Sequence, residues 1–517
     1  MPTRRFKLLV VLLGLALAAP AAVRADAPSD RQVLHLLNRI GFGPSAADVA
    51  HVKQVGIDRY IDEQLHPESI AEPPELTARL ATLDTLKLDP AQLFAQYGPI
   101  LPVMNGGAKP TPEEAKARRQ RAQVIVREAQ EGRLWRALYS RRQLQEAMVD
   151  FWYNHFNVFA GKGLDHLWVG NFEATAIRPH ALGHFRDLLL ATARHPAMLF
   201  YLDNQLNTAP GSPGVRGNLT GLNENYAREI MELHTLGVDG GYTQADVESL
   251  ARILTGWGFD RRALRDGNVP VFAFEAARHD TAEKTFLGRT IQPTGESEGI
   301  EAIGMLASSP ATAHHIAIEL AQYFVADKPA PALVDRLAQR FRETDGDIAA
   351  VMKTLLTSRE FRDSAGQKYK TPYQYVLSAA RAAGAEVNNP RPLLNTMARL
   401  GMPLYYCQTP DGYKNTEDSW LSPDSTTLRI GFATGFGRGT LPLKAPPPPD
   451  QAAGETPPPQ PQLVADQPPA KPQPLDPAPL MALLGSTLSD NTRATVAQAE
   501  PSLKAALVLG SPDFMRR

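Results

Sequence analysis

Two glutamates and an asparagine amide share one face of a predicted helix within the segment Asn223–Gly237. Residues three and four positions apart are neighbours on a helix, so Asn225, Glu229 and Glu232 lie together. The adjacent apolar stripe consists of Tyr226, Ile230, Leu233 and Gly237. Because an apolar stripe packs inward, we expect both glutamates to be buried, facing the helix that carries Asn154 and His155.

Buried carboxylates of this kind can hold a metal ion, exchange protons with a substrate, or pair with arginine. In an active site, Glu229 or Glu232 would act as the base and Arg228 would clamp an anion. Arg228 can also pair with Glu224 or Glu232, four residues away on either side. Two alternatives are a polar network that locks helices together and a row of solvated helix charges.

A second stretch, Asp150–Asn157, is aromatic on one side and amide-rich on the other. Its aromatic face surrounds His155, which could carry protons, as could His234. The alternative for His155 is a core histidine with its hydrogen bonds satisfied. The polar stripe consists of Asp150, Asn154 and Asn157, and we expect it to form the wall of a cavity.

No metal site is predicted, and the sequence indicates no particular cofactor. His180 and His184 have a spacing that chelates metals on a helix, but no third ligand lies nearby. The oxygen-rich loop at 203–207 lacks the glycine and closing glutamate of a calcium loop. Zinc-protease, ferritin-like, phosphate-loop and hydrolase-elbow motifs are all absent. Cys407 is the single cysteine and has no base beside it in sequence.

The elements that position these residues are helical almost throughout. Ser29 and Ser45 are expected to cap the first two helices, and Gly56-Ile57 leads into the third. Further helices are predicted at 144–159, 224–236, 243–254 and from 298 to about 361, and the charged stretch 113–133 reads as a solvated helix. A minor β excursion is expected at 268–295. The fold class is therefore mainly α, with a large multi-helix body over 26–444.

Both ends of the chain carry recognisable segments. Residues 1–25 have the basic start, apolar run and small-residue end of a signal peptide, with the mature chain starting at Asp26. The proline-rich tract 445–479 is expected to be a disordered insertion that cannot form a helix, followed by a helical tail at 480–517. The predicted localisation is periplasmic or secreted.

Composition limits the classes of partner. Lys and Arg total 54 against 55 for Asp and Glu, which argues against nucleic acid. No later stretch is apolar enough for a mature transmembrane segment. A single cysteine rules out an intramolecular disulfide and a thiolate-rich metal or iron–sulfur site.

The chain resembles the bacterial family catalogued as domain of unknown function 1800. The likeness lies in His35–Pro44, Phe151–Phe156, Asn223–Gly237, Gly241–Thr243, Ala251-Arg252, Leu254–Trp257, Lys370–Tyr373, Gly412-Tyr413, Trp420 and Ser511–Phe514. The resemblance implies an exported protein encoded beside the 1501 family of unknown function, which looks like phosphatases or sulfatases. It thus implies such a protein as partner, but it lends no catalytic role to any residue.

Two functional hypotheses follow. The first is an exported protein whose polar cleft, between the helices at 144–159 and 224–236, binds or processes a polar substrate of the cell envelope. The second is a non-enzymatic envelope scaffold, or an accessory subunit of the exported partner. A cleft requires Glu229, Glu232 and His155 around one open cavity, whereas a scaffold would have them sealed and paired.

Overall fold

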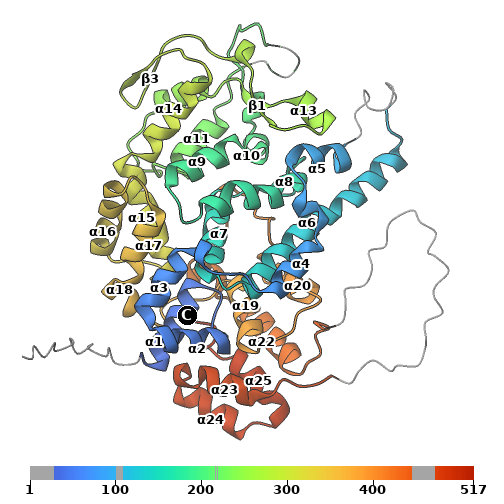
Figure 1. Cartoon of the computed structure of the whole chain (residues 1–517), viewed down its shortest axis with the longest axis vertical. Helices are drawn as coiled ribbons and strands as arrows, with labels where there is room; N and C mark the ends of the chain where they lie inside the picture. Colours follow the sequence, from blue (N-terminus) through green and yellow to red (C-terminus); the bar gives the residue numbers. More distant parts are fainter. Residues whose placement is uncertain (1–27, 100–108, 216, 218, 220, 445–471) are drawn as a thin grey trace, which may run out of the picture.

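The computed structural model describes residues 28–99, 109–215, 217, 219, 221–444 and 472–517. The predicted signal peptide at 1–25 and most of the predicted disordered tract, 445–471, lie outside the described residues. Within them the chain is mainly α, as predicted: 25 α-helices and two small sheets (Figure 1). None of these helices combines the length and the apolarity needed to cross a membrane.

The first part of the chain forms α1 (Asp30–Ile40), α2 (Ala46–Val55), α3 (Ile57–Leu65), α4 (Pro74–Ala81), α5 (Pro90–Tyr97), α6 (Pro112–Tyr139) and α7 (Gln143–His155). The middle forms α8 (Asp165–Phe172), α9 (Phe185–Arg194), α10 (Pro196–Tyr201), α11 (Asn225–Glu232), α12 (Gln244–Ile253), α13 (Arg261–Asp266) and α14 (Glu296–Ala307). Then come α15 (Pro310–Phe324), α16 (Pro331–Glu343), α17 (Ile348–Leu356), α18 (Arg359–Arg362), α19 (Pro372–Ala382), α20 (Arg391–Arg399), α21 (Glu417–Trp420) and α22 (Pro423–Gly437). The tail forms α23 (Pro477–Leu484), α24 (Asp490–Gln498) and α25 (Pro501–Leu509).

Local side-chain caps explain where several helices begin. Ser29 and Ser45 cap the first two helices, as predicted, and each forms a capping box, with Gln32 and Asp48 three residues later. Thr243 starts α12 in the same way, with Asp246 as the reciprocal partner. Each box satisfies two backbone N–H groups that would otherwise lack partners, so these boundaries follow from sequence alone.

The β excursion forms two antiparallel hairpins. Strand β1 (Trp257–Phe259) pairs with β2 (Phe272–Phe274), and β3 (Lys284–Phe286) pairs with β4 (Arg289–Ile291). The second hairpin turns at Leu287 and Gly288, both with positive φ, as a two-residue turn of this twist requires. Three of the four strands lie within the predicted 268–295, and β1 precedes that range.

The long helix α6 corrects the prediction of a solvated helix at 113–133. Its second half is buried, and the Arg133 guanidinium bonds to Asp150 of α7 at 2.6 Å. Both side chains are only 7 % exposed. Tyr323 of α15 donates its hydroxyl hydrogen to the other Asp150 oxygen at 2.8 Å. The charges of α6 therefore form an internal ion network as well as a solvated face.

The C-terminal tail packs against the rest of the body. Lys368 and Arg517 exchange backbone hydrogen bonds, and the end of the chain lies beside α1 (Figure 1). Helix α23 begins at Pro477, which corrects the prediction that no helix forms before residue 480. Asp476 caps this helix, and prolines in a first turn are tolerated because those N–H groups have no helical acceptor.

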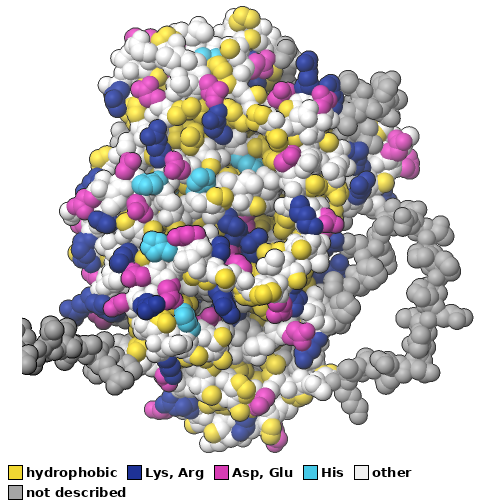
Figure 2. Space-filling view, in the orientation of Figure 1, with side chains coloured by type: hydrophobic (Ala, Val, Ile, Leu, Met, Phe, Trp, Pro, Cys, Tyr) yellow, Lys and Arg dark blue, Asp and Glu magenta, His cyan; other side chains and the backbone are white. Residues whose placement is uncertain are grey.

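Charges of both signs alternate over the face shown in Figure 2, without a continuous patch of either sign. This distribution agrees with the near-zero net charge of the chain. It gives this face no extended basic track of the kind that follows a nucleic-acid backbone.

Candidate functional site

The two glutamates of α11 lie at the surface, half-buried, which corrects the prediction that they are buried. The apolar stripe is as predicted, since Tyr226 and Ile230 are 1 % and 0 % exposed. α11 ends at Glu232, four residues before the predicted end. Beyond it the N–H groups of Leu233 and His234 both bond to the carbonyl of Glu229, which turns the chain out of the helix.

The carboxylate of Glu229 makes no hydrogen bond or ion pair with any residue that the structure describes. Its pKa is raised, first by burial and then by the charge of Glu232; the charge of Arg228 lowers it in part, and Asp411 adds a smaller raising effect. Asp411 stays ionised because Lys414 donates to it at 2.7 Å. Burial alone would raise the pKa of Asp411, but the hydrogen bonds from Lys414 and Thr409 lower it. Glu229 therefore lies beside two like charges, and the one cation that acts on it, Arg228, makes no direct ion pair with it.

The other polar groups of α11 face its neighbours. Arg228 donates to Glu224 at 3.1 Å and to Gln244 of α12 at 3.0 Å, so its guanidinium joins two helices. Glu232 accepts a long hydrogen bond, 3.4 Å, from the hydroxyl of Tyr242. Asn225 is exposed, and its amide donates to the carbonyl of Leu202. The direct hydrogen bonds of Arg228 thus go to Glu224 and Gln244, and it acts on Glu229 through its charge alone.

His155, the last residue of α7, is sealed and paired. Its Nδ1 lies 2.7 Å from Oε2 of Glu319 in α15, and its Nε2 lies 3.2 Å from the carbonyl oxygen of His234. His315, also on α15, reaches the carbonyl of Leu233 at 3.1 Å. These histidines thus bind the two carbonyls just beyond α11 and join α7, α11 and α15.

His234 itself is buried, 1 % exposed, and its Nε2 has no hydrogen-bond partner among the described residues. Burial lowers its pKa well below the ordinary value, and the charges of His155 and His315 lower it further. The carboxylate that lies beside His155 and His315 is Glu319. Burial alone would raise its pKa, but the charge and hydrogen bond of His155, with His315 and Lys414, lower it.

Asn154 and Asn157 both bind backbone groups of one distant segment of the chain. The Asn154 amide donates to the carbonyl of Tyr413 at 2.8 Å and accepts from the N–H of Tyr413 at 2.7 Å. Asn157 donates to the carbonyls of Cys407 and Thr409. The two amides therefore hold the segment 407–414, whose Asp411 lies near Glu229.

The predicted site residues thus separate into two groups. Glu229 and Glu232 lie at the surface with Asp411, while His155 and His234 lie in the sealed contact with α15. Sequence reasoning missed Glu319, His315, Asp411 and Lys414. His315 and Glu319 are four apart on one helix, a spacing that could have marked them, whereas Asp411 carries no local signal.

The weaker metal candidates do not assemble a site. His180 lies in a short 3₁₀ turn and His184 precedes α9, so the two do not share a helix as their spacing suggested. In the loop at 203–207, Asp203 pairs with Lys162 and Asn207 binds backbone. Among the residues that the structure describes, no three His, Cys, Asp or Glu side chains could together hold a metal ion.

Cavities lie elsewhere on the molecule. Five with volumes of about 320 to 510 Å³ open on the described surface. None of these five is lined by Glu229, Glu232, His155 or His234. The glutamates therefore belong to an open surface and not to any of these cavities.

Comparison with known proteins supports one assignment. The chain matches none of the curated proteins and none of the solved structures with which it was compared. One family model matches residues 35–516, nearly the whole chain. This match confirms the resemblance seen in the sequence motifs, and the chain belongs to the family described as protein of unknown function (DUF1800).

Proposed function

We propose that this chain is an exported protein that binds a polar envelope ligand at the surface formed by Glu229, Glu232 and Asp411, which we call the α11 surface. The observation that carries the proposal is Glu229 itself. It is a half-buried carboxyl with no partner among the described residues and a raised pKa. A folded protein gains nothing in stability from such a group, whereas a ligand-binding or proton-exchanging site uses it.

The chemistry of the α11 surface favours a ligand that carries hydroxyl or amino groups. A protonated Glu229 can donate a hydrogen bond while ionised Glu232 accepts one, so the pair can hold a hydroxyl from two sides. A ligand amine would stabilise both carboxylates in their ionised form. An amino sugar combines both kinds of group, and the carboxyl pair would also serve as acid and base if the ligand is processed.

The histidines have a positioning role in this proposal. His155 and His315 bind the carbonyls just beyond Glu232, which supports the end of α11 where the glutamates lie. His155 is 7 % exposed and His234 1 %, so neither can reach a ligand at the surface without local opening. We therefore assign proton exchange to Glu229 and not to these imidazoles.

The alternative is a non-enzymatic accessory subunit or scaffold for an exported, phosphatase- or sulfatase-like protein of the 1501 family. One observation favours it: His155, Glu319 and His315 are mutually paired, as in a structural network. In that case the α11 surface would meet a protein, not a small ligand.

Ligand-dependent stabilisation of the purified protein separates these cases. We expect glucosamine to raise the midpoint of thermal unfolding more than glucose does, and glucuronate to give no increase. Glu229→Gln should remove the increase. Glu248→Gln is the matched control, because Glu248 is an exposed glutamate on the neighbouring α12 with no partner among the described residues.

No stabilisation by any of the three sugars, with co-purification of an exported phosphatase-like protein that Glu229→Gln abolishes, would instead support the accessory subunit. The predicted export is tested separately. N-terminal sequencing of secreted or periplasmic material should start at Asp26, and a start at Met1 would contradict it.

A further inference from the structure

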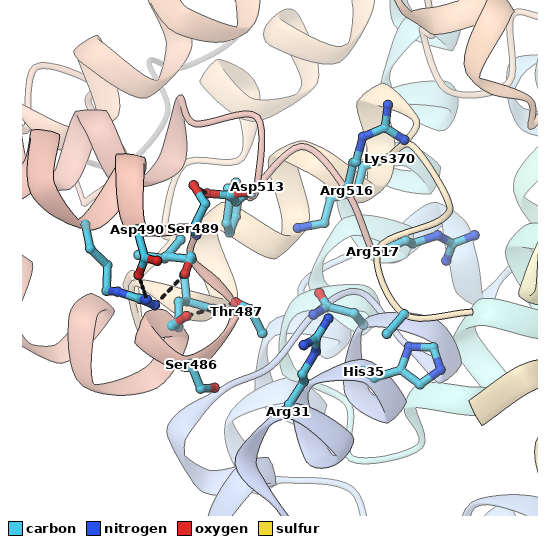
Figure 3. Close-up of a pocket in the computed structure, with 17 residues that line it drawn as sticks. Arg31, His35, Lys370, Ser486, Thr487, Ser489, Asp490, Asp513, Arg516 and Arg517 are labelled. Atoms are coloured by element: carbon cyan, nitrogen blue, oxygen red, sulfur yellow. Dashed lines mark hydrogen bonds and ion pairs between the residues drawn. The ribbon is translucent and has the colours of Figure 1, made fainter. Parts of the chain in front are cut away.

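A basic cavity of about 510 Å³ lies where three distant parts of the chain meet, far from the α11 surface in sequence (Figure 3). Arg31 and His35 of α1 form one wall, and Lys370, Arg516 and Arg517 form another. The third wall is the turn before α24 with Asp513 near the end of the chain. A volume of this size fits a small-molecule ligand.

Five arginine or lysine side chains and two aspartates line this cavity, and both aspartates are engaged in their own wall. Asp490 pairs with Arg493, three residues later. Asp513 accepts hydrogen bonds from the backbone N–H of Ser489 and, at 2.6 Å, from the hydroxyl of Thr492. Neither carboxylate therefore balances the cations on the opposite walls.

Lys370 is the most unusual of these cations. Its side chain is buried, at 3 % exposure, yet its ammonium makes no hydrogen bond or ion pair with any described residue. Its Nζ atom lies over the face of the Phe514 ring, 3.8 Å from the ring centroid. Burial lowers the pKa of Lys370 well below its ordinary value, and the charges of Arg517 and Arg429 lower it further.

The other two buried lysines of the described chain each have the counter-charge that Lys370 lacks. Lys284 lies 2.6 Å from a carboxylate oxygen of Glu298, and Lys368 pairs with Asp327. Both ammonium groups thus have a protein anion beside them, as buried charges normally do. Lys370 has a cavity in the place of that anion.

One further cationic group is open to a ligand, and another is buried beside the cavity. Arg31 is exposed and pairs with no described residue. Arg517 uses one terminal nitrogen on the carbonyl of Tyr323, but its Nε–H is buried without a partner. Arg516 is committed to Glu417 outside the cavity. His35 donates Nε2–H to the carbonyl of Phe361, and its pKa is lowered to about 4, so it adds no charge at neutral pH.

We propose that this cavity binds a small molecule through a phosphate or sulfate group, which would lie against Lys370 beside the positive charge of buried Arg517, with Arg31 at the opening. A doubly charged oxyanion supplies the missing counter-charge and accepts several N–H donors at once. The polar side chains of the turn before α24, Ser486 and Thr487, would contact the remainder of the ligand.

Thermal unfolding and isothermal titration calorimetry of the full chain test the proposal. The probes are inorganic phosphate, inorganic sulfate and glucose 6-phosphate, each against chloride at equal ionic strength. We expect saturable binding of at least one oxyanion and none of chloride. Tighter binding of glucose 6-phosphate than of phosphate would identify the ligand as an ester, and equal binding would identify it as the free anion.

Lys370→Met should weaken this binding roughly tenfold or more, because it removes a charge-assisted hydrogen bond, while the ligand-free midpoint stays equal or rises. Arg31→Gln, at an exposed position, should weaken binding several-fold with no change in the midpoint. Two variants serve as controls. Lys284→Met should lower the midpoint but leave oxyanion binding to the folded protein unchanged, and exposed Arg342→Gln should change neither.

Oxyanion binding no stronger than that of chloride would overturn the proposal. So would unchanged affinity in Lys370→Met or, if that variant does not fold, unchanged affinity in Arg31→Gln.

Discussion

The Nδ1 atom of His155 lies 2.7 Å from Oε2 of Glu319, which joins the end of α7 to a helix 164 residues further along the chain. The other ring nitrogen of His155 faces the carbonyl oxygen of His234. Both ring nitrogens of His155 thus face oxygen atoms that can accept hydrogen bonds. This pair fixes the end of α11, where the two glutamates lie.

Replacing Glu319 with glutamine should destabilise the fold by about 1–2 kcal/mol at pH 7, since His155 loses its charged hydrogen-bond partner. The pKa of Glu319 is lowered in the folded protein, so its stabilising effect is full above the unfolded value of about 4.3. That effect is lost as the pH falls through the lower folded pKa. Urea unfolding at pH 7 and near pH 3 measures the difference, with Glu343→Gln on exposed α16 as control.

A loss of stability equal at both pH values would mean that Glu319 acts through its shape and not its charge.

The Arg133–Asp150 pair makes a second prediction. Both side chains are 7 % exposed and lie 2.6 Å apart, so Asp150→Asn leaves a buried guanidinium without its nearest charge. We expect a loss of about 3–5 kcal/mol of unfolding free energy. The surface pair Arg359–Asp363 is the control, because both side chains are mostly exposed, and Asp363→Asn should cost less than about 1 kcal/mol. Similar losses in both variants would argue against an internal ion network.

Replacing Asp165 should stabilise the fold, in contrast to the replacements of Glu319 and Asp150. It is 0 % exposed, neither carboxylate oxygen has a hydrogen-bond partner among the described residues, and burial raises its pKa well above the ordinary value. The folded protein therefore loses stability as the pH rises from the unfolded pKa, about 3.9, through the raised folded pKa. Asp165→Asn removes this loss and should stabilise the protein by about 1–3 kcal/mol at pH 7.5.

Chemical denaturation of both proteins at pH 7.5 and pH 4 checks the prediction. The gain should be smaller at pH 4, and a destabilised Asp165→Asn at pH 7.5 would show that the carboxylate has a structural partner.

Helix starts could be predicted from sequence because the capping residues act on their own turn. Ser29, Ser45 and Thr243 each bond to a backbone N–H three residues later, and all three helices begin where expected. The end of α11 could not be predicted in this way. The periodicity of Leu233–Leu236 continues the helix, but His155 and His315 bind the carbonyls of this stretch from other helices.

The candidate site was also predictable only in part, because contacts from distant parts of the chain determine its surroundings. The shared face of Glu229 and Glu232 follows from helical spacing, and the apolar stripe beside them is buried as expected. The charge near Glu229 depends in part on Asp411 in the segment 407–414, which Asn154 and Asn157 hold from the end of α7. Because that segment is about 250 residues away in sequence, no local pattern reveals that the two amides bind backbone instead of a ligand.

Glutamine substitutions at the α11 surface separate a ligand site from a structural one. Because Glu229 has no protein partner, Glu229→Gln should leave the unfolding free energy at pH 7 unchanged or raise it by up to about 1 kcal/mol, a small effect at a half-exposed position. Glu232→Gln loses only the long bond from Tyr242 and should stay within about 0.5 kcal/mol of the wild type. Losses above about 1 kcal/mol in both variants would instead support a structural network.

The most direct test of the central claim is the pKa of the Glu229 carboxyl, followed by infrared spectroscopy across pH. The signal of this group is the carboxylic-acid C=O band that disappears in Glu229→Gln, and exposed Glu248 gives the reference band through Glu248→Gln. Burial and the charge of Glu232 raise the pKa of Glu229, so its band should persist to higher pH than that of Glu248. If the Glu229 band is lost at the same pH as the Glu248 band or below it, Glu229 has a cationic or hydrogen-bonding partner in the protein, and the α11 surface is not the proposed ligand site.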